Sequence, residues 1–240
     1  MKKFTVKELQ DIYNKHCNLP DEYFSKYEDF LKFVDLNVWE IHKTPGGHHP
    51  SNMDLPRLYC ILDFKEWVIK HKLNPIKKLL TTANDPEIKF LQYIHKFEAN
   101  YDRDAINYDL HLLNLKEKDF DFVLFSQTLE HLYNPQLAIE NLSKHLKPGG
   151  YMFTSVPINC IPHMTPIHFQ QFTPMGLATL LISNNYKILE IGQYGSAKFM
   201  NYIADHPYWP KYYDIIDENN QIKNDKNLPC HCWVLAKKIK

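Results

Sequence analysis

The stretch FDFVLFSQTLEHLYNPQLAIENLSKHLKPGGYMFTSVP, residues 120–157, decides the fold of this chain. It opens with an apolar run that ends in a polar turn at residues 126–128, as a buried strand does when it reaches the edge of a sheet. Apolar residues at helical spacing follow over residues 134–146, and the Lys-Pro-Gly-Gly sequence of residues 147–150 ends that helix. Residues 151–157 are again apolar and strand-like. This succession of strand, helix and strand predicts one βαβ unit of a parallel sheet.

The same alternation continues along the C-terminal two-thirds of the chain. Short apolar runs predict further strands at residues 76–83, 97–101, 106–110, 186–195 and 232–238. Helices are predicted at residues 85–96, with Pro86 in the first turn, and at residues 173–185, with Thr173 as cap and Pro174 at the first position. The last two strands lack a helix of the usual length between them, which favours an antiparallel edge. We therefore expect an α/β fold over residues 75–240, with a mostly parallel sheet and helices on both faces.

The first 74 residues have a different character. Residues 4–16, 21–41 and 57–72 show apolar side chains at helical spacing, and the sequence TPGGHHPSNMDLP at residues 44–56 interrupts the helices. We expect residues 1–74 to form a helical N-terminal extension that covers the site as a lid.

Composition and charge exclude several classes of protein. Lys+Arg and Asp+Glu both total 28, so no overall basic field attracts nucleic acid. No apolar run approaches the roughly 20 residues of a membrane span, and the charged start of the chain lacks an apolar signal core. The five cysteines are odd in number and mostly scattered, which does not fit a disulfide scaffold. We expect a cytoplasmic protein without a nucleic-acid partner, and a homodimer stays open.

The Leu129-Glu130-His131-Leu132 motif and its spacing to the Lys-Pro-Gly-Gly turn resemble class I S-adenosylmethionine-dependent methyltransferases of the type 11 group. In that group an apolar strand leads to the LEHL segment, and a helix ends in LKPGG before the next strand. The resemblance implies a Rossmann-like methyltransferase fold, methyl transfer as the activity and S-adenosylmethionine as the cofactor.

The resemblance also implies where the cofactor binds, because ligands of open α/β sheets lie outside the carboxyl ends of the strands. In similar proteins an acid after the third strand receives the adenine amino group. Asp109 matches that acid, and a solvated turn is its alternative interpretation. Glu98 or Asp102 would accept the ribose hydroxyls, and the choice between them stays open. The expected cofactor-binding residues are Thr82, Ala83, Asn84, Asp85, Glu98, Asp102, Asp109, Leu110, Ser126, Gln127, Thr128 and His131.

The chain departs from the family in the loop after the first strand. The family has an acid-x-Gly-x-Gly loop there, whereas residues 79–87 read LLTTANDPE and no glycine lies between Gly47 and Gly149. Glycine matters in such a loop because it lets the backbone approach a ligand closely. Only 23 residues separate Asp85 from Asp109, fewer than the about 30 of a full βαβ unit. We therefore expect an abbreviated cofactor site on this side.

Two histidines lie in the loop after residues 151–157, at the ligand-binding end of the predicted sheet. Methyl transfer requires alignment of the acceptor and, for a hydroxyl acceptor, removal of a proton. Histidine titrates in the appropriate range. We predict that His163 and His168 act as base or as acceptor-positioning residues, and a structural role through hydrogen bonds stays open for each.

The Cys230-His231-Cys232 triplet raises the question of a metal site. A Cys-x-Cys pair lacks the paired spacing of zinc sites. On a terminal strand, Cys230 and Cys232 would share one buried face. We therefore expect no metal.

Two functions remain open from the sequence. The first is an S-adenosylmethionine-dependent methyltransferase that modifies oxygen or nitrogen of a small molecule or a cell-surface sugar. The second is a non-catalytic binding protein with a methyltransferase fold, which the missing glycines favour. A nicotinamide-dependent oxidoreductase would require G-x-G-x-x-G after the first strand, and the chain has none.

Overall fold

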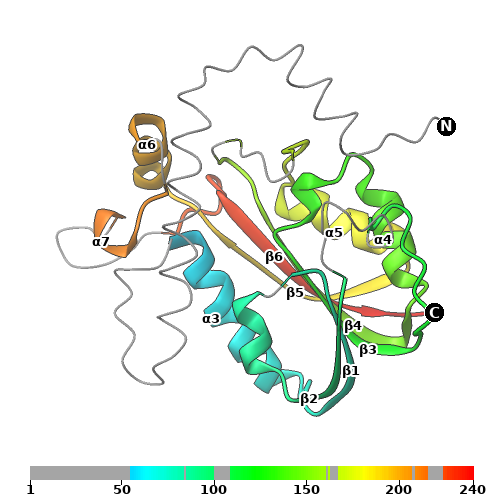
Figure 1. Ribbon diagram of the computed structural model, residues 1–240. Helices are drawn as coiled ribbons and strands as arrows, with labels where there is room; N and C mark the ends of the chain where they lie inside the picture. The colour runs from blue at the N-terminus through cyan, green and yellow to red at the C-terminus, as the bar shows by residue number, and fades with distance from the viewer. Residues whose placement is uncertain are drawn as a thin grey trace.

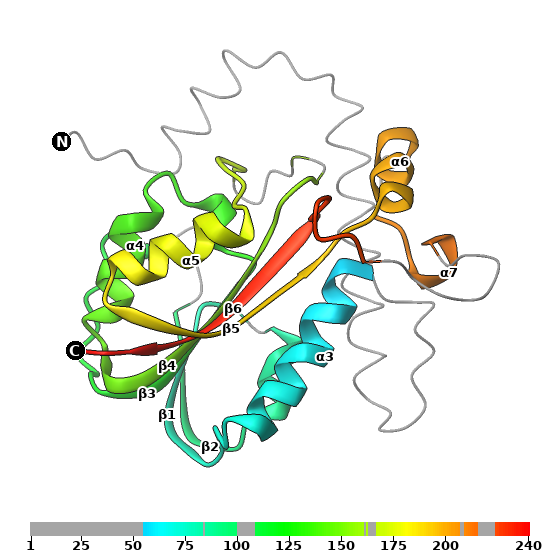
Figure 2. The ribbon, with the colours of Figure 1, turned by 180° about the vertical axis from the view of Figure 1, so that it is seen from behind.

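The computed structural model describes the chain from residue 55 onward, in the ranges 55–83, 85–99, 109–160, 167–206, 209–215 and 224–240 together with residue 162. Figures 1 and 2 show a twisted sheet with helices packed on two faces. The helices predicted for residues 4–16 and 21–41 lie outside the described residues.

Six strands form one sheet in the order β2-β1-β3-β4-β6-β5. Neighbours from β2 to β4 pair in parallel, whereas β6 is antiparallel to both β4 and β5. The predicted mostly parallel sheet with an antiparallel C-terminal edge is confirmed. The strands are β1 (Ile76–Thr81), β2 (Tyr93–Glu98), β3 (Phe120–Ser126), β4 (Leu146–Pro157), β5 (Tyr186–Tyr194) and β6 (His231–Lys238).

Helices cover both faces of this sheet, as expected. In Figure 1, α4 and α5 lie on one side and α3 lies on the other. The helices are α3 (Leu55–Lys70), η2 (Pro86–Phe90), η4 (Leu129–His131), α4 (Pro135–Ser143), α5 (Pro174–Ser183), α6 (Ala197–Asp205) and α7 (Tyr212–Ile215), where η marks a short 3-10 helix.

Two hydrophobic cores stabilise the two faces. One contains residues of α4 and α5, among them Ile139 and Leu181. The other contains residues of α3 and α6, among them Phe64 and Phe199. The ring centroid of Phe64 lies 4.4 Å from that of Phe153 in β4. Helix α3, which the sequence assigned to the N-terminal extension, therefore packs directly on the sheet.

A side chain caps the first turn of both α4 and α5. The side chain of Thr173 accepts a hydrogen bond from the backbone N–H of Gly176, and Pro174 occupies the first helical position. Asn134 accepts in the same way from the N–H of Leu137. The predicted cap at Thr173 is confirmed.

The predicted helix at residues 85–96 is wrong. Only the 3-10 helix η2 forms, and the chain is already extended at Tyr93, where β2 begins. Pairing with β1 accounts for the difference, because the backbone of β2 satisfies the open edge of β1 from Ile76 onward. Tertiary pairing here overrides the local helical pattern.

Three further predictions need correction. Residues 97–101 were predicted as a separate strand, but Phe97 and Glu98 are the end of β2. Asp109 and Leu110 of the predicted strand at 106–110 are not in a strand, and the rest of that segment lies outside the described residues. The Lys-Pro-Gly-Gly sequence belongs to the start of β4 and passes through a positive φ of 76° at Gly149.

Cys230 and Cys232 are both buried, but they do not share a face. Cys230 packs in the core under α3, and Cys232 packs in the core under α4 and α5. Cys230 precedes β6, which begins at His231, so the alternation of side chains along a strand does not apply to it.

Candidate functional site

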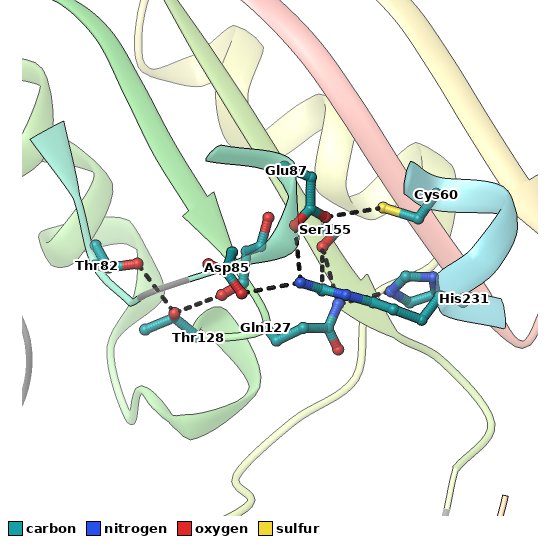
Figure 3. Close-up of polar contacts among 10 residues, drawn as sticks. Cys60, Thr82, Asp85, Glu87, Gln127, Thr128, Ser155 and His231 are labelled. Carbon is teal, nitrogen blue, oxygen red and sulfur yellow. Dashed lines mark hydrogen bonds and ion pairs between the residues drawn. The ribbon is translucent and has the colours of Figure 1, made fainter. Parts of the chain in front are cut away.

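The carboxyl ends of β1 and β3 form the switch point of the sheet, because β2 lies on one side of β1 and β3 lies on the other. Thr82 follows β1 and Thr128 follows β3. Their hydroxyl oxygens lie 3.2 Å apart (Figure 3). The Thr128 hydroxyl donates to the carbonyl of Ser126 at 2.8 Å, so Thr82 is the donor to Thr128. The two strand ends are thereby joined at the place where such folds bind ligands.

A partly buried arginine reaches this edge from the first turn of α3. Nη2 of Arg57 lies 2.9 Å from Oδ1 of Asp85 and 2.9 Å from Oε2 of Glu87. Its Nη1 lies 3.4 Å from Oγ of Ser155 at the end of β4. The thiol of Cys60 donates to the other oxygen of Glu87 at 3.6 Å (Figure 3). This contact set ties α3 to the loop that would hold glycines in the resembling family.

The charges in this set do not cancel. Burial by itself lowers the pKa of Arg57, but the carboxylates of Glu87 and Asp85 raise it above its usual value, so the guanidinium is always charged. Burial raises the pKa of Asp85 despite the neighbouring guanidinium. Oδ2 of Asp85 is buried and has no hydrogen-bond partner in the described structure. One guanidinium serves two carboxyl groups, which leaves Oδ2 of Asp85 available to a ligand.

Gln127 turns away from the switch point. Its backbone has a positive φ of 47°, and its Nε2 lies 2.9 Å from Oγ of Ser155 and 2.6 Å from Nε2 of His231. Because an amide N–H only donates, that His231 nitrogen is the acceptor. Gln127 therefore connects β3 to β4 and β6.

Asp109 stands in a tight turn. Its Oδ1 accepts from the backbone N–H of His111 at 2.9 Å and lies 2.7 Å from the Nδ1 of the same residue. Burial opposes ionisation, but these hydrogen bonds from His111 lower the pKa of Asp109 below its usual range. The His111 ring stacks on Tyr133 with centroids 4.0 Å apart. Leu110 is buried in the core under α4 and α5, so its side chain supports the turn from below.

Glu130 is the most unusual side chain of the site. It is fully buried, and neither of its carboxyl oxygens has a hydrogen-bond partner within the described part of the chain. Burial raises the pKa of Glu130 to about 8. A carboxyl group in this situation is neutral at neutral pH unless a cation is brought to it.

His131 lies beside Glu130, and His168 packs against His131. Nε2 of His131 is 3.8 Å from Oε1 of Glu130, and its Nδ1 lies 3.0 Å from the carbonyl oxygen of Ile167. Burial lowers the pKa of His131 to about 4. The rings of His131 and His168 meet edge to face with centroids 6.1 Å apart, and burial also lowers the pKa of His168.

The structure places most of the predicted site residues at one edge. Glu98 is the last residue of β2, lies beside Thr81 in the sheet and forms an ion pair with Lys96 at 2.8 Å. Ala83 is partly buried in the turn after β1. Asn84, Asp102 and His163 lie outside the described residues.

Sequence reasoning missed Arg57, Glu87, Glu130 and Ser155. One signal was available for the first of them: Arg57 and Arg103 are the only arginines of a chain whose other basic side chains are lysines. Arginine is preferred over lysine for buried pairs with carboxylates. Glu130 sits inside the quoted LEHL motif, but only its burial in the structure distinguishes it.

Within the described ranges, no three His, Cys, Asp or Glu side chains form a group that could hold a metal ion. No helix of that part of the chain has the length and apolarity needed to cross a membrane.

Comparisons with known proteins agree with this architecture. The family model described as a methyltransferase domain matches residues 76–154, from the start of β1 into β4. The crystal structure of the [4+2]-cyclase SpnF is similar in fold, with a TM-score of 0.51, 12% identity and coverage of 100% of this chain and 98% of that one. No curated protein sequence matches the chain.

Two further solved structures are similar at lower scores. A Burkholderia thailandensis 1,6-didemethyltoxoflavin-N1-methyltransferase has a TM-score of 0.48 and 12% identity, with 100% of this chain and 93% of that one covered. An S-adenosylmethionine-dependent methyltransferase from Clostridium acetobutylicum has a TM-score of 0.48 and 9% identity, with 98% and 99% covered.

Proposed function

Because the chain belongs to the type 11 group of class I S-adenosylmethionine-dependent methyltransferases, we propose that it methylates an oxygen or nitrogen atom of a small molecule or sugar. The observation that carries the proposal is the match over residues 76–154, which spans both strands of the switch point. S-adenosylmethionine supplies a methyl group that is already activated on a sulfonium.

The residues at the switch point fit the positive charges of this cofactor. S-adenosylmethionine carries a sulfonium and an ammonium group, and the site holds buried carboxyl oxygens of Asp85 and Glu130 that lack a partner among the described residues. A buried carboxyl oxygen without a hydrogen-bond partner is costly, so a cationic ligand that binds there would stabilise the arrangement. Arg57 is the partly buried cation that we assign to the cofactor's carboxylate.

The remaining cofactor contacts follow from position. Glu98, at the end of β2, is the acid that we assign to the ribose hydroxyls. Asp109 would receive the adenine amino group through Oδ2, which has no hydrogen bond to the described residues, whereas Oδ1 is held by His111. Thr82 and Thr128 would line the pocket between these two groups.

On the acceptor side, His168 is the proposed proton acceptor. Burial keeps its imidazole neutral at neutral pH, which is the form that can take a proton from a hydroxyl. His131 is also neutral, but its Nδ1 is engaged with the carbonyl of Ile167, so we assign it a positioning role. Helix α3, which carries Arg57, would cover the pocket and contribute to acceptor selection.

One observation favours the second candidate, a non-catalytic protein. Asp85 and Glu87 of the chain itself hold Arg57, in the loop where the family has glycines. If that pairing never opens, the cofactor's carboxylate has no partner and the fold serves only to bind another molecule.

Transfer of an isotopically labelled methyl group separates the two candidates. The purified protein is incubated with S-adenosylmethionine carrying a deuterated methyl and with pools of sugars and small metabolites, and labelled products are sought by mass spectrometry. With the acceptor in hand, we expect His168→Gln to lower kcat about 100-fold or more with little change in KM. His95→Gln, on the exposed face of β2, is the matched control. Absence of labelled product in every pool would favour the non-catalytic protein.

A further inference from the structure

The contacts within the described structure do not explain why the Glu130 side chain is buried. It lies in η4, directly after the polar turn that ends β3. Its side chain is 0% exposed, and both oxygens are without a hydrogen bond to any described residue. Leaving a buried polar atom unsatisfied costs about 1–3 kcal/mol, so two such atoms on one side chain point to a missing partner.

The charged and titratable groups around Glu130 do not supply that partner. They are Arg57 of α3, Asp85 of the first loop, Cys160 of the loop after β4, Cys232 of β6 and the adjacent His131. The segment before α5 also contacts Glu130, because the backbone N–H of Phe169 donates to the Glu130 carbonyl, and it carries His168, whose ring packs against His131.

None of these groups neutralises Glu130. Burial raises the pKa of the Cys160 and Cys232 thiols, so both are uncharged. The guanidinium of Arg57 is already shared by Asp85 and Glu87. Nε2 of His131 lies 3.8 Å away, which is too long for a hydrogen bond. Asp85 has the same sign of charge as Glu130 and opposes its ionisation.

We propose that Glu130 is the binding site for the positive charge of a sulfonium, and that its carboxyl group is neutral in the ligand-free protein and ionises when the sulfonium binds. The proposal rests on the proposed function, because that function brings a sulfonium to the switch point. It adds a residue that distinguishes the methyl donor from its demethylated product.

The physical reason is the low dielectric of the site. Opposite charges a few ångströms apart attract strongly where water is excluded, and a nearby cation favours the charged form of a carboxyl group. The thioether of S-adenosylhomocysteine is neutral, so it provides no such attraction. Glu130 should therefore release its proton on binding the donor and keep it on binding the product.

Proton release is measured by titration calorimetry in buffers of different ionisation enthalpy at pH 7. We expect S-adenosylmethionine to release close to one proton more from the wild type than from Glu130→Gln. S-adenosylhomocysteine should show no such difference. The methionine ammonium is common to both ligands, so any proton that it displaces from Asp85 is the same in both titrations. Glu117→Gln, on an exposed segment, is the matched control and should behave as the wild type.

Glu130→Gln should also reduce the preference for the donor over the product by about tenfold or more, which corresponds to about 1.4 kcal/mol. Equal proton release from wild type and Glu130→Gln, with tight donor binding in both, would overturn the proposal and leave the proposed function intact. If S-adenosylmethionine does not bind the wild type at all, the proposed function fails and this proposal fails with it.

A measurement on the wild type alone covers the case that Glu130→Gln does not fold. Release of a proton makes donor affinity rise with pH. The increase in Tm caused by S-adenosylmethionine should therefore grow between pH 6 and pH 8 relative to that caused by S-adenosylhomocysteine. Parallel curves for the two ligands would contradict the proposal.

Discussion

Nη2 of Arg57 lies 2.9 Å from Oε2 of Glu87, a carboxylate with no solvent exposure. Arg57 belongs to α3, outside the matched methyltransferase segment, whereas Glu87 belongs to the loop after β1 inside it. The contact shows that α3 reaches the edge of the sheet at which we propose that the cofactor binds. The loop after β1 has no glycine, and the ion pair with Arg57 of α3 holds it in place.

Loss of this arginine should be strongly destabilising. Arg57→Met leaves two buried carboxyl groups without a cation, and breaking a buried pair in this way costs about 3–5 kcal/mol. Urea unfolding at pH 7 measures the change in the free energy of unfolding. The double variant Arg57→Met/Glu87→Gln should recover a large part of the loss, and a loss of less than 1 kcal/mol in the single variant would mean that the pair is not maintained in solution.

The stability of the ligand-free protein should fall as pH rises, because of Glu130. Its folded-state pKa of about 8 lies above the usual value of 4.5, so the folded state binds more protons than the unfolded state between these two values. The contribution is fully present below about pH 4.5 and is lost by about pH 8, on the order of a few kcal/mol, since one pKa unit corresponds to about 1.4 kcal/mol.

Urea unfolding of the wild type and of Glu130→Gln at pH 5 and at pH 8.5 tests this pH dependence. The variant should be more stable than the wild type at pH 8.5 and should show a smaller decline between the two pH values. Burial also raises the pKa of Asp85, so a residual decline of the same sign is expected. Identical declines in both proteins would show that Glu130 is not buried as described.

Variants of Asp109 and His111 distinguish a structural role of Asp109 from a role in cofactor binding. Asp109→Ala removes both hydrogen bonds to His111 and the oxygen proposed for adenine, so stability should fall by about 1 kcal/mol and the affinity for S-adenosylmethionine by about tenfold. His111→Phe keeps the stacking on Tyr133 but loses the ring hydrogen bond. It also loses the hydrogen bond that the backbone N–H of Asn134 donates to Nε2 of His111, so it should affect stability with little change in Kd. If the two variants weaken cofactor binding equally, Asp109 acts only through the turn.

The sequence predicted those parts of the fold that depend on local patterns. Strand β3 coincides with the apolar run FDFVLFS, and the cap at Thr173 follows from a side chain three residues from its partner. The helix at residues 85–96 was predicted wrongly, because pairing of β2 with the edge of β1 overrides a helical spacing of apolar residues. Local pattern carries no information about such an edge.

The residues of the candidate site also fall into two groups, those that the strand pattern predicts and those that depend on tertiary packing. Thr82, Glu98 and Thr128 lie at or just after the carboxyl ends of strands, so topology alone brings them to one edge. Arg57 reaches that edge from 30 residues before Glu87 in the chain, and Glu130 is recognisable only by its burial. Both depend on packing between segments that no local pattern connects.

The most direct test of the account is calorimetric titration of the ligand-free protein with S-adenosylmethionine, in the wild type, in Glu98→Gln and in Glu117→Gln. We expect the wild type to bind at micromolar concentration and Glu117→Gln to bind equally well. Binding to Glu98→Gln should be weaker by about fivefold or more, because this variant loses a charge-assisted hydrogen bond of about 1–2 kcal/mol. No heat of binding and no increase in Tm at millimolar cofactor would contradict the account and leave a methyltransferase fold that serves another ligand.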